Sequence, residues 1–301
     1  MSEFEPILVQ RDGWGDASGW AAAFLAGFKS SETRRSYRRD LDCWFAFCAT
    51  HQLHPYRELR RTHVEVYLRE LEAQEPAPAN ATLYRRIATL SSWFRWLEDE
   101  DVTVGNPAAR VRGPPRHPRP QPWLNRNELT DVLAAAEDGG GDAYALACLL
   151  GLNGLRVSEA CNANITDVGG SRYQPMLLMM GKGDKPAEVV LNPRTQQALD
   201  QVIDGRTIGP LLRNQWRRRM QPHNAAAVLR RLARAAHITK RVTPHALRRS
   251  YITIGLLQGV PLRDMQRAAR HSKADTTVGY DQSDRSFHRD PTFILMSATA
   301  R

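Results

Sequence analysis

The chain has 301 residues, of which 42% are hydrophobic and 25% are charged, with four cysteines and a net charge of +10. This length accommodates two domains, each with its own core, and excludes a single very small domain. No apolar run approaches the length needed to span a bilayer, and the N-terminal MSEFEPILVQ lacks the basic and apolar regions of a secretory signal. We therefore expect a soluble, cytoplasmic protein.

The positive charge is concentrated in the second part of the chain. Residues 1–106 carry 13 Lys and Arg against 16 Asp and Glu, whereas residues 107–301 carry 29 against 16. Such an excess attracts a polyanion, and nucleic acid is the commonest one in a cytoplasm. Solubility through high net charge is the alternative. Since the cysteines form no CxxC pair, we expect buried thiols rather than a zinc site or disulfides.

The first third of the chain is predicted to form a bundle of about four helices. Apolar residues recur at helical spacing in four segments: 19–28, 33–52, 63–74 and 81–100. One stripe of the second segment is predicted to be buried and consists of Tyr37, Leu41, Trp44, Phe45 and Cys48. The opposite faces carry arginines that we expect either to contact DNA phosphates or to form a solvated surface: Arg34, Arg35, Arg38, Arg39, Arg85 and Arg86.

Residues 107–121 are predicted to form an extended, basic linker. The stretch NPAARVRGPPRHPRPQP contains six prolines, which supply no backbone donor for regular structure. Its arginines are expected to lie against a polyanion and include Arg112, Arg116 and Arg119.

The remaining residues predict a mostly helical domain with one small sheet. Asn125 and Glu128 form a capping-box pattern that opens the first helix. Helices are expected at 126–137, 142–152, 193–203, 222–236, 244–258 and 261–270. Two β-rich runs within 172–192 flank GKGDKP and predict a hairpin. The basic run RNQWRRRM, with Arg217 and Arg218, is expected either to follow a phosphate backbone or to be solvated.

Six polar residues of this domain stand in short patterns that are weak one by one. A surface ion pair, a solvated turn, a satisfied histidine or a core tyrosine would explain each of them alone. Their order along the chain is the stronger signal. In that order they are Arg156 of GLRVSE, Lys182 of GKGDK, His245 and Arg248 of HALR, and His271 and Tyr280, the two ends of HSKADTTVGY.

This ordered set resembles that of the tyrosine recombinases, which include the phage integrases and the Xer-type recombinases. In that family an arginine in GLRxSE, a lysine on a β-hairpin, HxLR, and a His or Trp followed by the nucleophilic tyrosine occur in this order. The resemblance covers nearly the whole chain. It implies a helical, SAM-like core-binding domain at 1–106, a linker at 107–121 and a catalytic domain with a C-terminal tail at 122–301. The implied fold is mainly α with a small antiparallel sheet, in two domains that clamp DNA.

The chemistry of these residue types agrees with the resemblance. Two guanidiniums can hold the non-bridging oxygens of a pentacoordinate phosphate without a metal, which we expect of Arg156 and Arg248. A phenol with a pKa of about 10 needs cations or a base to become a nucleophile, so we expect Tyr280 to attack with His245 as base or proton shuttle. No HExxH motif or Walker loop is present, and we expect neither a metal nor another cofactor.

Three further roles follow from the resemblance. A lysine on the hairpin would protonate the leaving 5′-oxygen, and we expect Lys182 to do so, with Lys185 as the alternative. His271 would hydrogen-bond the scissile phosphate. Glu159 would orient Arg156 or the lysine hairpin from behind.

The chain departs from the family pattern in two places. The family most often has Leu-Gly before the second histidine, where this chain has Ala269 and Arg270, so the geometry of that loop is in question. Arg249 stands where histidine is frequent. The chain ends in an apolar cluster that we expect to dock either on a neighbouring protomer or on its own domain: Phe293, Ile294, Leu295 and Met296.

The resemblance implies a site-specific recombinase, an integrase of a phage or another mobile element. It would exchange strands of double-stranded DNA through a 3′-phosphotyrosyl intermediate and a Holliday junction, as a homotetramer on its sites. An accessory directionality factor is a further partner to be tested. The alternatives are a type IB topoisomerase, which shares the chemistry, and a DNA-binding regulator that keeps the fold without the activity.

Overall fold

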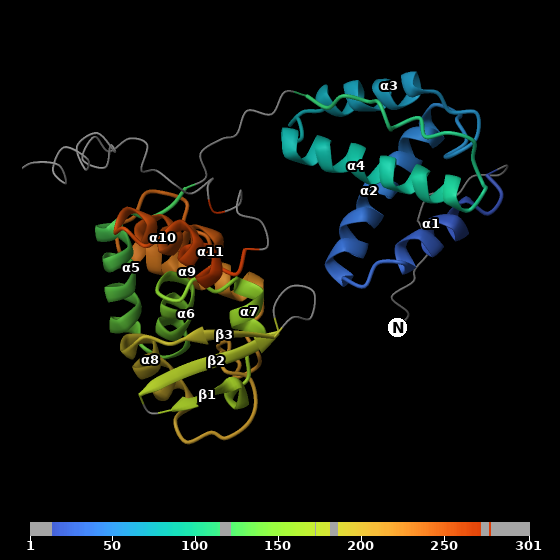
Figure 1. Cartoon of the computed structure of the whole chain (residues 1–301). Helices are drawn as coiled ribbons and strands as arrows, with labels where there is room; N and C mark the ends of the chain where they lie inside the picture. The colour runs from blue at the N-terminus through green and yellow to red at the C-terminus, as the bar shows by residue number, and fades with distance from the viewer. Residues whose placement is uncertain (1–13, 115–121, 172, 181–185, 272–276, 278–301) are drawn as a thin grey trace, which may run out of the picture. The chain divides into compact units, whose positions relative to one another are not determined.

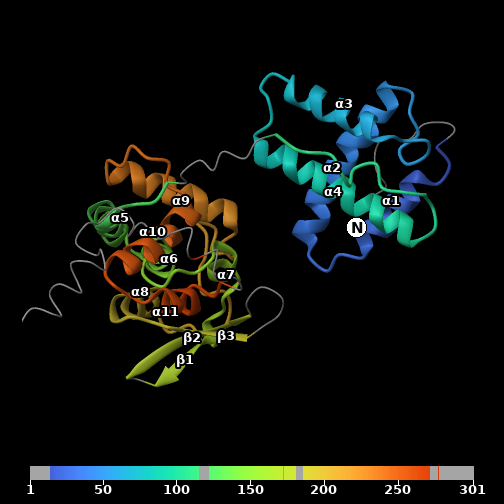
Figure 2. The same cartoon turned by 45° about the horizontal axis from the view of Figure 1, so that its top comes forward.

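The computed structural model describes residues 14–114, 122–171, 173–180, 186–271 and 277. The chain divides into two compact units, Met1–Arg119 and Pro120–Arg301, each with its own hydrophobic core. Figures 1 and 2 show the helices and strands of both units. Over the described residues, no helix combines the length and apolar character required to cross a membrane.

The N-terminal unit contains four α-helices within the described residues: α1 (Ala17–Ala26), α2 (Ser31–Thr50), α3 (Arg61–Glu72) and α4 (Asn80–Asp99). Helix α4 packs against the other three (Figure 1), and aromatic side chains fill much of the space between them. Trp44 and Trp93 are fully buried, and the Trp44 ring meets Tyr67 edge to face with ring centroids 5.2 Å apart. The predicted stripe of α2 is buried except for Tyr37, which is half-buried.

The C-terminal unit is built around α6, which packs against five other helices. From Tyr144 to Gly151 every residue of α6 is buried, as the apolar sequence YALACLLG requires. The helices of this unit are α5 (Arg126–Gly139), α6 (Gly141–Gly151), α7 (Val157–Asn162), α8 (Pro193–Ile203), α9 (Pro222–Ala235), α10 (Pro244–Leu257) and α11 (Leu262–Ala268). The predicted cap of α5 is confirmed, since Glu128 N donates to Asn125 Oδ1 at 3.0 Å and Asn125 N donates to Glu128 Oε2 at 2.8 Å.

A three-stranded antiparallel sheet lies at one edge of this unit, away from α10 (Figure 1). Strands β2 (Gln174–Met180) and β3 (Pro186–Val190) form the expected hairpin, with Leu177 opposite Val189. Strand β1 (Val168–Ser171), which pairs with β2, was not predicted. The mainly α fold with one small antiparallel sheet is confirmed. Of the cysteines, Cys48, Cys148 and Cys161 are buried and Cys43 is half-buried, all as free thiols.

Candidate active site

Arg156 is placed by the turn that opens α7. Gly154 has a φ of +61°, a left-handed conformation that glycine adopts readily, and it turns the chain into the helix. Arg156 then stands at the N-cap, where its backbone N donates to Glu159 Oε2 at 2.7 Å. The Arg156 side chain donates from Nη1 to Glu159 Oε1, also at 2.7 Å. Both ends of the glutamate carboxylate are therefore used to fix this arginine.

Helix α10 supplies the second arginine and the first histidine. Thr243 caps the helix by accepting a hydrogen bond from Ala246 N at 3.1 Å, so His245 lies in the first turn and Arg248 one turn later. The Arg248 side chain is only 3% exposed and donates to the carbonyl oxygens of Gly154 and Ala269. Arg248 therefore ties α10 to the start of α7 and to the end of α11.

His271 follows α11 directly. Its backbone N donates to Gln266 O at 3.1 Å, and its Nδ1 lies 2.9 Å from Oγ1 of the buried Thr277. The residue before it, Arg270, accepts a hydrogen bond at its carbonyl oxygen from Arg156 Nη2 at 3.2 Å. Arg156, at the N-cap of α7, therefore also holds the turn that carries His271.

The ionisation of these groups shows how strongly cationic the site is. Burial, and then the positive charges of Arg248, Arg156 and Arg270, lower the pKa of His271 from its usual 6.5 to about 4. Desolvation, and then neighbouring guanidiniums, also lower the pKa of His245. Both histidines are therefore neutral at physiological pH.

Glu159 is the acidic member of this cluster. Burial opposes its ionisation, but the charge of Arg270 and the hydrogen bonds from Arg156 outweigh that effect and hold its pKa below the usual range. The site thus combines three guanidiniums with one carboxylate and leaves an excess of positive charge.

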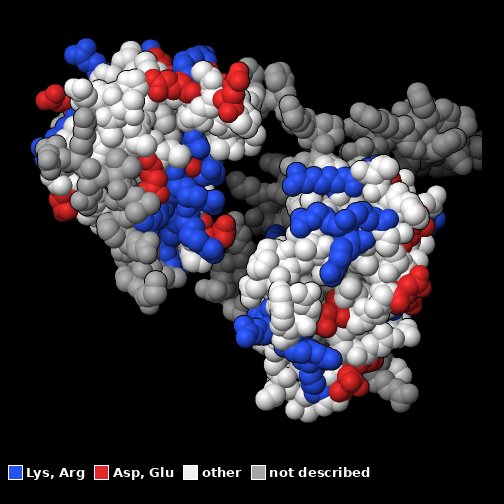
Figure 3. Space-filling model, turned by 180° about the vertical axis from the view of Figure 1, so that it is seen from behind, with Lys and Arg blue, Asp and Glu red and all other residues white. Residues whose placement is uncertain are grey.

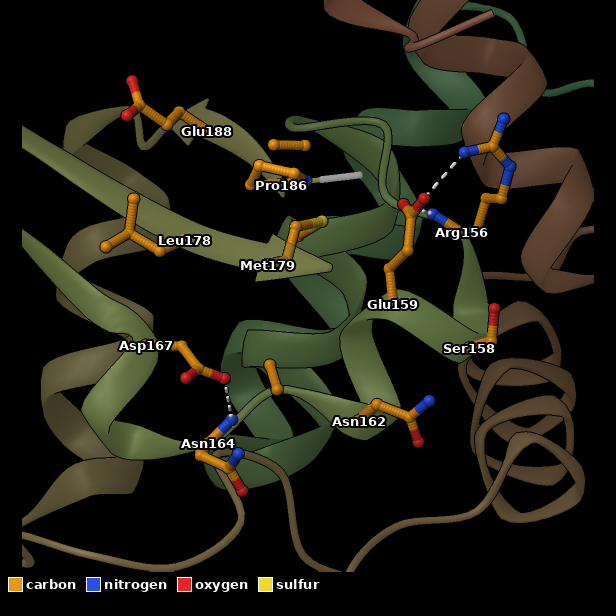
Figure 4. A pocket seen from close by; sticks show the side chains of 12 residues that line it. Arg156, Ser158, Glu159, Asn162, Asn164, Asp167, Leu178, Met179, Pro186 and Glu188 are labelled. Carbon is orange, nitrogen blue, oxygen red and sulfur yellow. Dashed lines mark hydrogen bonds and ion pairs between the residues drawn. The ribbon is translucent and has the colours of Figure 1, made fainter. Parts of the chain in front are cut away.

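A cavity of about 740 Å³ opens beside Arg156, between α7 and the strands β2 and β3. Figure 4 shows Arg156 and Glu159 facing one another at one end of it and Asn164 and Asp167 at the other. The hairpin side is lined by Leu178, Met179, Pro186, Ala187 and Glu188. The end of β2 and the start of β3, which precede and follow residues 181–185, therefore border the same cavity as Arg156.

Several expected site residues lie outside the described residues. They are Lys182, Lys185, Tyr280, Arg116, Arg119 and the apolar cluster Phe293–Met296. Of the expected catalytic set, the structure therefore brings together four, namely Arg156, His245, Arg248 and His271, with Glu159 behind them.

The arginines of α2 differ in how much of them faces solvent. Arg35 and Arg39 are exposed, and Arg35 pairs with Glu32 at 3.2 Å. Arg34 is half-buried and donates to Phe28 O at 2.8 Å, so it closes the end of α1. Arg38, also half-buried, lies 3.9 Å from Asp42. In the linker, Arg112 is exposed.

Arg85 and Arg86 are occupied inside the N-terminal unit by Asp40, which is 2% exposed. Arg85 Nη1 donates to Asp40 and also to Ser36 Oγ at 2.9 Å, while Arg86 Nε lies 4.0 Å from Asp40 Oδ1. The Arg86 side chain is only 17% exposed. Arg86 therefore faces the interior of the bundle, and its contact with a DNA phosphate stays a prediction.

The basic run after α8 forms an ordered turn. Asn214 Oδ1 accepts hydrogen bonds from the backbone N of Trp216 and of Arg218, at 3.0 and 3.1 Å, and residues 213 and 219 form a β-bridge. Trp216, Arg217 and Arg218 are exposed at its tip. Figure 3 shows Lys and Arg side chains gathered in patches on the surface of both units.

Sequence reasoning missed two residues that shape this picture. Asp40 lies among the basic residues of α2 and was not singled out from the sequence. Its position on the same side of the helix as the buried apolar residues would have predicted a buried carboxylate. Arg270 was noted only as a departure, and its inward-facing side chain could not be inferred from its position in the chain.

Fold and site together define a mainly α protein with a cationic cluster of the kind that binds phosphate. A model of the phage integrase family matches residues 122–286, and a model of the phage integrase N-terminal SAM-like domain matches residues 24–101. Tyrosine recombinase XerC of Mycobacterium sp. (strain KMS) is 33% identical over 268 residues, covering 84% of this chain and 88% of that protein. Tyrosine recombinase XerD of Oceanobacillus iheyensis is 27% identical, covering 83% and 87%.

Solved structures share the fold. The XerH site-specific recombinase bound to its difH substrate matches with a TM-score of 0.72 and 16% identity, over 98% of this chain and 99% of that one. The Tn1549 transposon integrase in complex with circular intermediate DNA matches with a TM-score of 0.72 and 17% identity, over 94% and 98%. The chain therefore belongs to the phage integrase family and is a tyrosine site-specific recombinase.

Proposed function

We propose that this recombinase cleaves and rejoins double-stranded DNA through a 3′-phosphotyrosyl intermediate formed on Tyr280. The observation that carries the proposal is the cluster of Arg156, Arg248, His245 and His271, drawn from three separate helix ends into one cationic site. Two guanidiniums and two neutral imidazoles offer the hydrogen-bond donors that a pentacoordinate phosphate requires.

In the proposed reaction, Tyr280 Oη attacks the scissile phosphorus while Arg156 and Arg248 bind its non-bridging oxygens. His245 takes the phenolic proton, and the bond from phosphorus to the 5′-oxygen breaks. Lys182 protonates that oxygen, with Lys185 as the alternative. The phosphotyrosyl ester replaces the phosphodiester, so a 5′-hydroxyl of another strand can reverse the step with no external energy source.

We assign the parts of the chain as follows. Residues 1–106 form the core-binding domain, 107–121 the linker and 122–301 the catalytic domain, and the two domains clamp the DNA. Exposed arginines on both domains and the linker contact DNA phosphates: Arg35, Arg39, Arg112, Arg217 and Arg218. Three half-buried arginines also contact phosphates once they leave their present partners: Arg34, Arg38 and Arg85. Arg116 and Arg119 complete the linker contacts.

The proposed assembly is a homotetramer that exchanges one strand pair, forms a Holliday junction and then exchanges the second pair. Its apolar C-terminal cluster docks on a neighbouring protomer. The protein acts in the cytoplasm on the DNA of the nucleoid, and an accessory factor sets the direction of recombination.

Covalent trapping tests the chemistry. Wild-type protein and Tyr280→Phe are incubated with nicked suicide substrates drawn from attachment sites flanking the gene, and the products are separated on a denaturing gel. We expect a protein–DNA adduct for the wild type and none for Tyr280→Phe. If the wild type binds these substrates but forms no adduct, the protein is a DNA-binding regulator. If it forms the adduct and only relaxes supercoils, as a monomer, it is a topoisomerase.

A further inference from the structure

We propose that Arg270 is a positioning residue that locks the turn carrying His271 onto the first turn of α7, which presents Arg156. The inference rests on the proposed function, because it assumes that Arg156 and His271 act on one phosphate. It adds a component that the six expected catalytic residues do not include.

The backbone of Arg270 indicates that the side chain is needed where it is. Its φ of +54° lies in the left-handed region, which glycine adopts readily and an arginine rarely does. A non-glycine residue persists in this conformation when surrounding contacts determine it. Arg270 must therefore gain contacts that offset the unfavourable conformation.

Those contacts reach from the end of α11 to the start of α7. Arg270 Nη2 donates to Glu159 Oε2 at 2.8 Å and lies 3.4 Å from Gly154 O, while Nη1 donates to Ala268 O at 3.0 Å. The side chain is 13% exposed, so these interactions are little weakened by water. Arg270 is thus held on both sides of the junction that it spans.

The contacts close a ring of three residues. Arg156 Nη1 donates to Glu159 Oε1, Arg270 Nη2 donates to Glu159 Oε2, and Arg156 Nη2 donates back to Arg270 O. Each member holds the other two, so displacement of any one shifts the Arg156 guanidinium relative to His271, the next residue in the chain. A ring of this kind fixes the angle at which the guanidinium meets a phosphate.

The charge of Arg270 acts on the same groups. It helps to keep Glu159 ionised, and together with Arg248, Arg156 and His245 it disfavours protonation of His271. Removing this guanidinium alone therefore frees the carboxylate to draw Arg156 away from the phosphate and makes His271 easier to protonate.

Three variants test the proposal. Arg270→Gly removes the side chain without straining the turn, because glycine accepts a positive φ. Arg270→Lys keeps the charge and the backbone strain. Arg267→Gln is the matched control, since it removes one positive charge from the exposed face of α11, three residues before Arg270, where the partner is Asp264 and not Glu159.

For each variant we would measure the single-turnover rate of adduct formation on a suicide substrate, the DNA affinity, the melting temperature and the pKa of His271 by NMR. Arg270→Gly is expected to slow adduct formation about tenfold, the effect of losing one charged hydrogen bond, while the DNA affinity changes less than about threefold. The pKa of His271 rises in that variant. Arg270→Lys recovers most of the rate and keeps the low pKa, and Arg267→Gln behaves as the wild type.

The proposal is overturned if Arg270→Gly forms the adduct within about twofold of the wild-type rate. It is equally overturned if the rate of adduct formation falls in Arg270→Gly while the pKa of His271 is unchanged. A third contrary result is a lower melting temperature, shared by Arg270→Lys, that accounts for the whole loss of rate. A wild type that binds DNA without forming an adduct contradicts the proposed function instead. In that case an unchanged pKa of His271 in Arg270→Gly still overturns the placement of Arg270 beside His271.

Discussion

Asp40 is the buried carboxylate that organises the basic side of the N-terminal unit. It accepts hydrogen bonds from Arg85 and, at 2.8 Å, from Thr89 Oγ1, and Arg86 lies beside it. Replacing it by alanine leaves the Arg86 side chain, which is 17% exposed, and the more exposed Arg85 without their counter-charge. We expect Asp40→Ala to lower the free energy of unfolding of this unit by about 3 kcal/mol, measured by urea titration with tryptophan fluorescence.

A surface pair of α2 provides the control for Asp40. Glu32 and Arg35 are both well exposed, so Glu32→Ala is expected to change the free energy of unfolding by no more than about 0.5 kcal/mol. Equal effects of the two substitutions would show that Asp40 does not hold the arginines.

His271 gives the catalytic unit a measurable pH dependence. Its pKa is about 4 in the folded protein and close to 6.5 when unfolded, so between these values the unfolded state binds a proton that the folded state does not. The contribution of His271 to the free energy of unfolding is therefore fully present above about pH 6.5, and it is lost as the pH drops toward 4. We expect His271→Gln to lose less stability than the wild type between about pH 7 and pH 5 in urea titrations. Identical losses would contradict the low pKa.

For single residues, the sequence predicted which residues belong to the candidate site, but it did not predict which side chains they contact. The motifs GLRVSE and HALR predicted Arg156 and Arg248 as site residues from residue type and from order along the chain. The inward turn of Arg86 toward Asp40, and of Arg270 toward Glu159, depends on contacts between segments far apart in sequence. Arginine is usually at the surface, so an isolated pattern favours exposure even where a buried carboxylate reverses it.

Helix α10 carries two members of the site, and its N-terminus is set by one side chain. Thr243 accepts a hydrogen bond from Ala246 N, and Pro244 follows at the first helical position. We expect Thr243→Ala to lower the free energy of unfolding of the catalytic unit by about 1 kcal/mol, in a urea titration. Thr243→Ser keeps the hydroxyl and should remain within about 0.5 kcal/mol of the wild type. If serine fails to preserve stability, the hydroxyl is not the cap.

Among the elements, the long helices with clear apolar periodicity were predicted to within a few residues. Strand β1, with the sequence VGGS, was not, because two glycines in four residues give no β-propensity. It pairs with β2, with Gly170 opposite Pro175. Gly170 has a φ of +90°, and a Cβ there would meet the backbone of Gln174, so the neighbouring strand requires glycine at this position. This requirement arises from contact with β2 and could not be predicted from the sequence VGGS alone.

For the whole molecule, the uneven distribution of charge makes a prediction about DNA binding. Residues 107–301 hold an excess of positive charge, and Arg217 and Arg218 project from an ordered turn within them. Each phosphate contact releases counterions, so the logarithm of the binding constant should fall by about 0.9 per contact for each unit of log salt concentration. We expect the double variant Arg217→Gln, Arg218→Gln to reduce that slope by about two and to weaken binding equally on specific and unrelated DNA.

The control for that experiment is Arg69→Gln, because Arg69 already pairs with Glu72 at 2.6 Å and its loss should leave the slope nearly unchanged. Binding would be followed by fluorescence anisotropy across a salt series. If the double variant keeps the wild-type slope, this turn lies away from the phosphates. The positive charge that drives association must then reside on other arginines, of which the exposed Arg230, Arg231 and Arg234 of α9 are the next to be replaced.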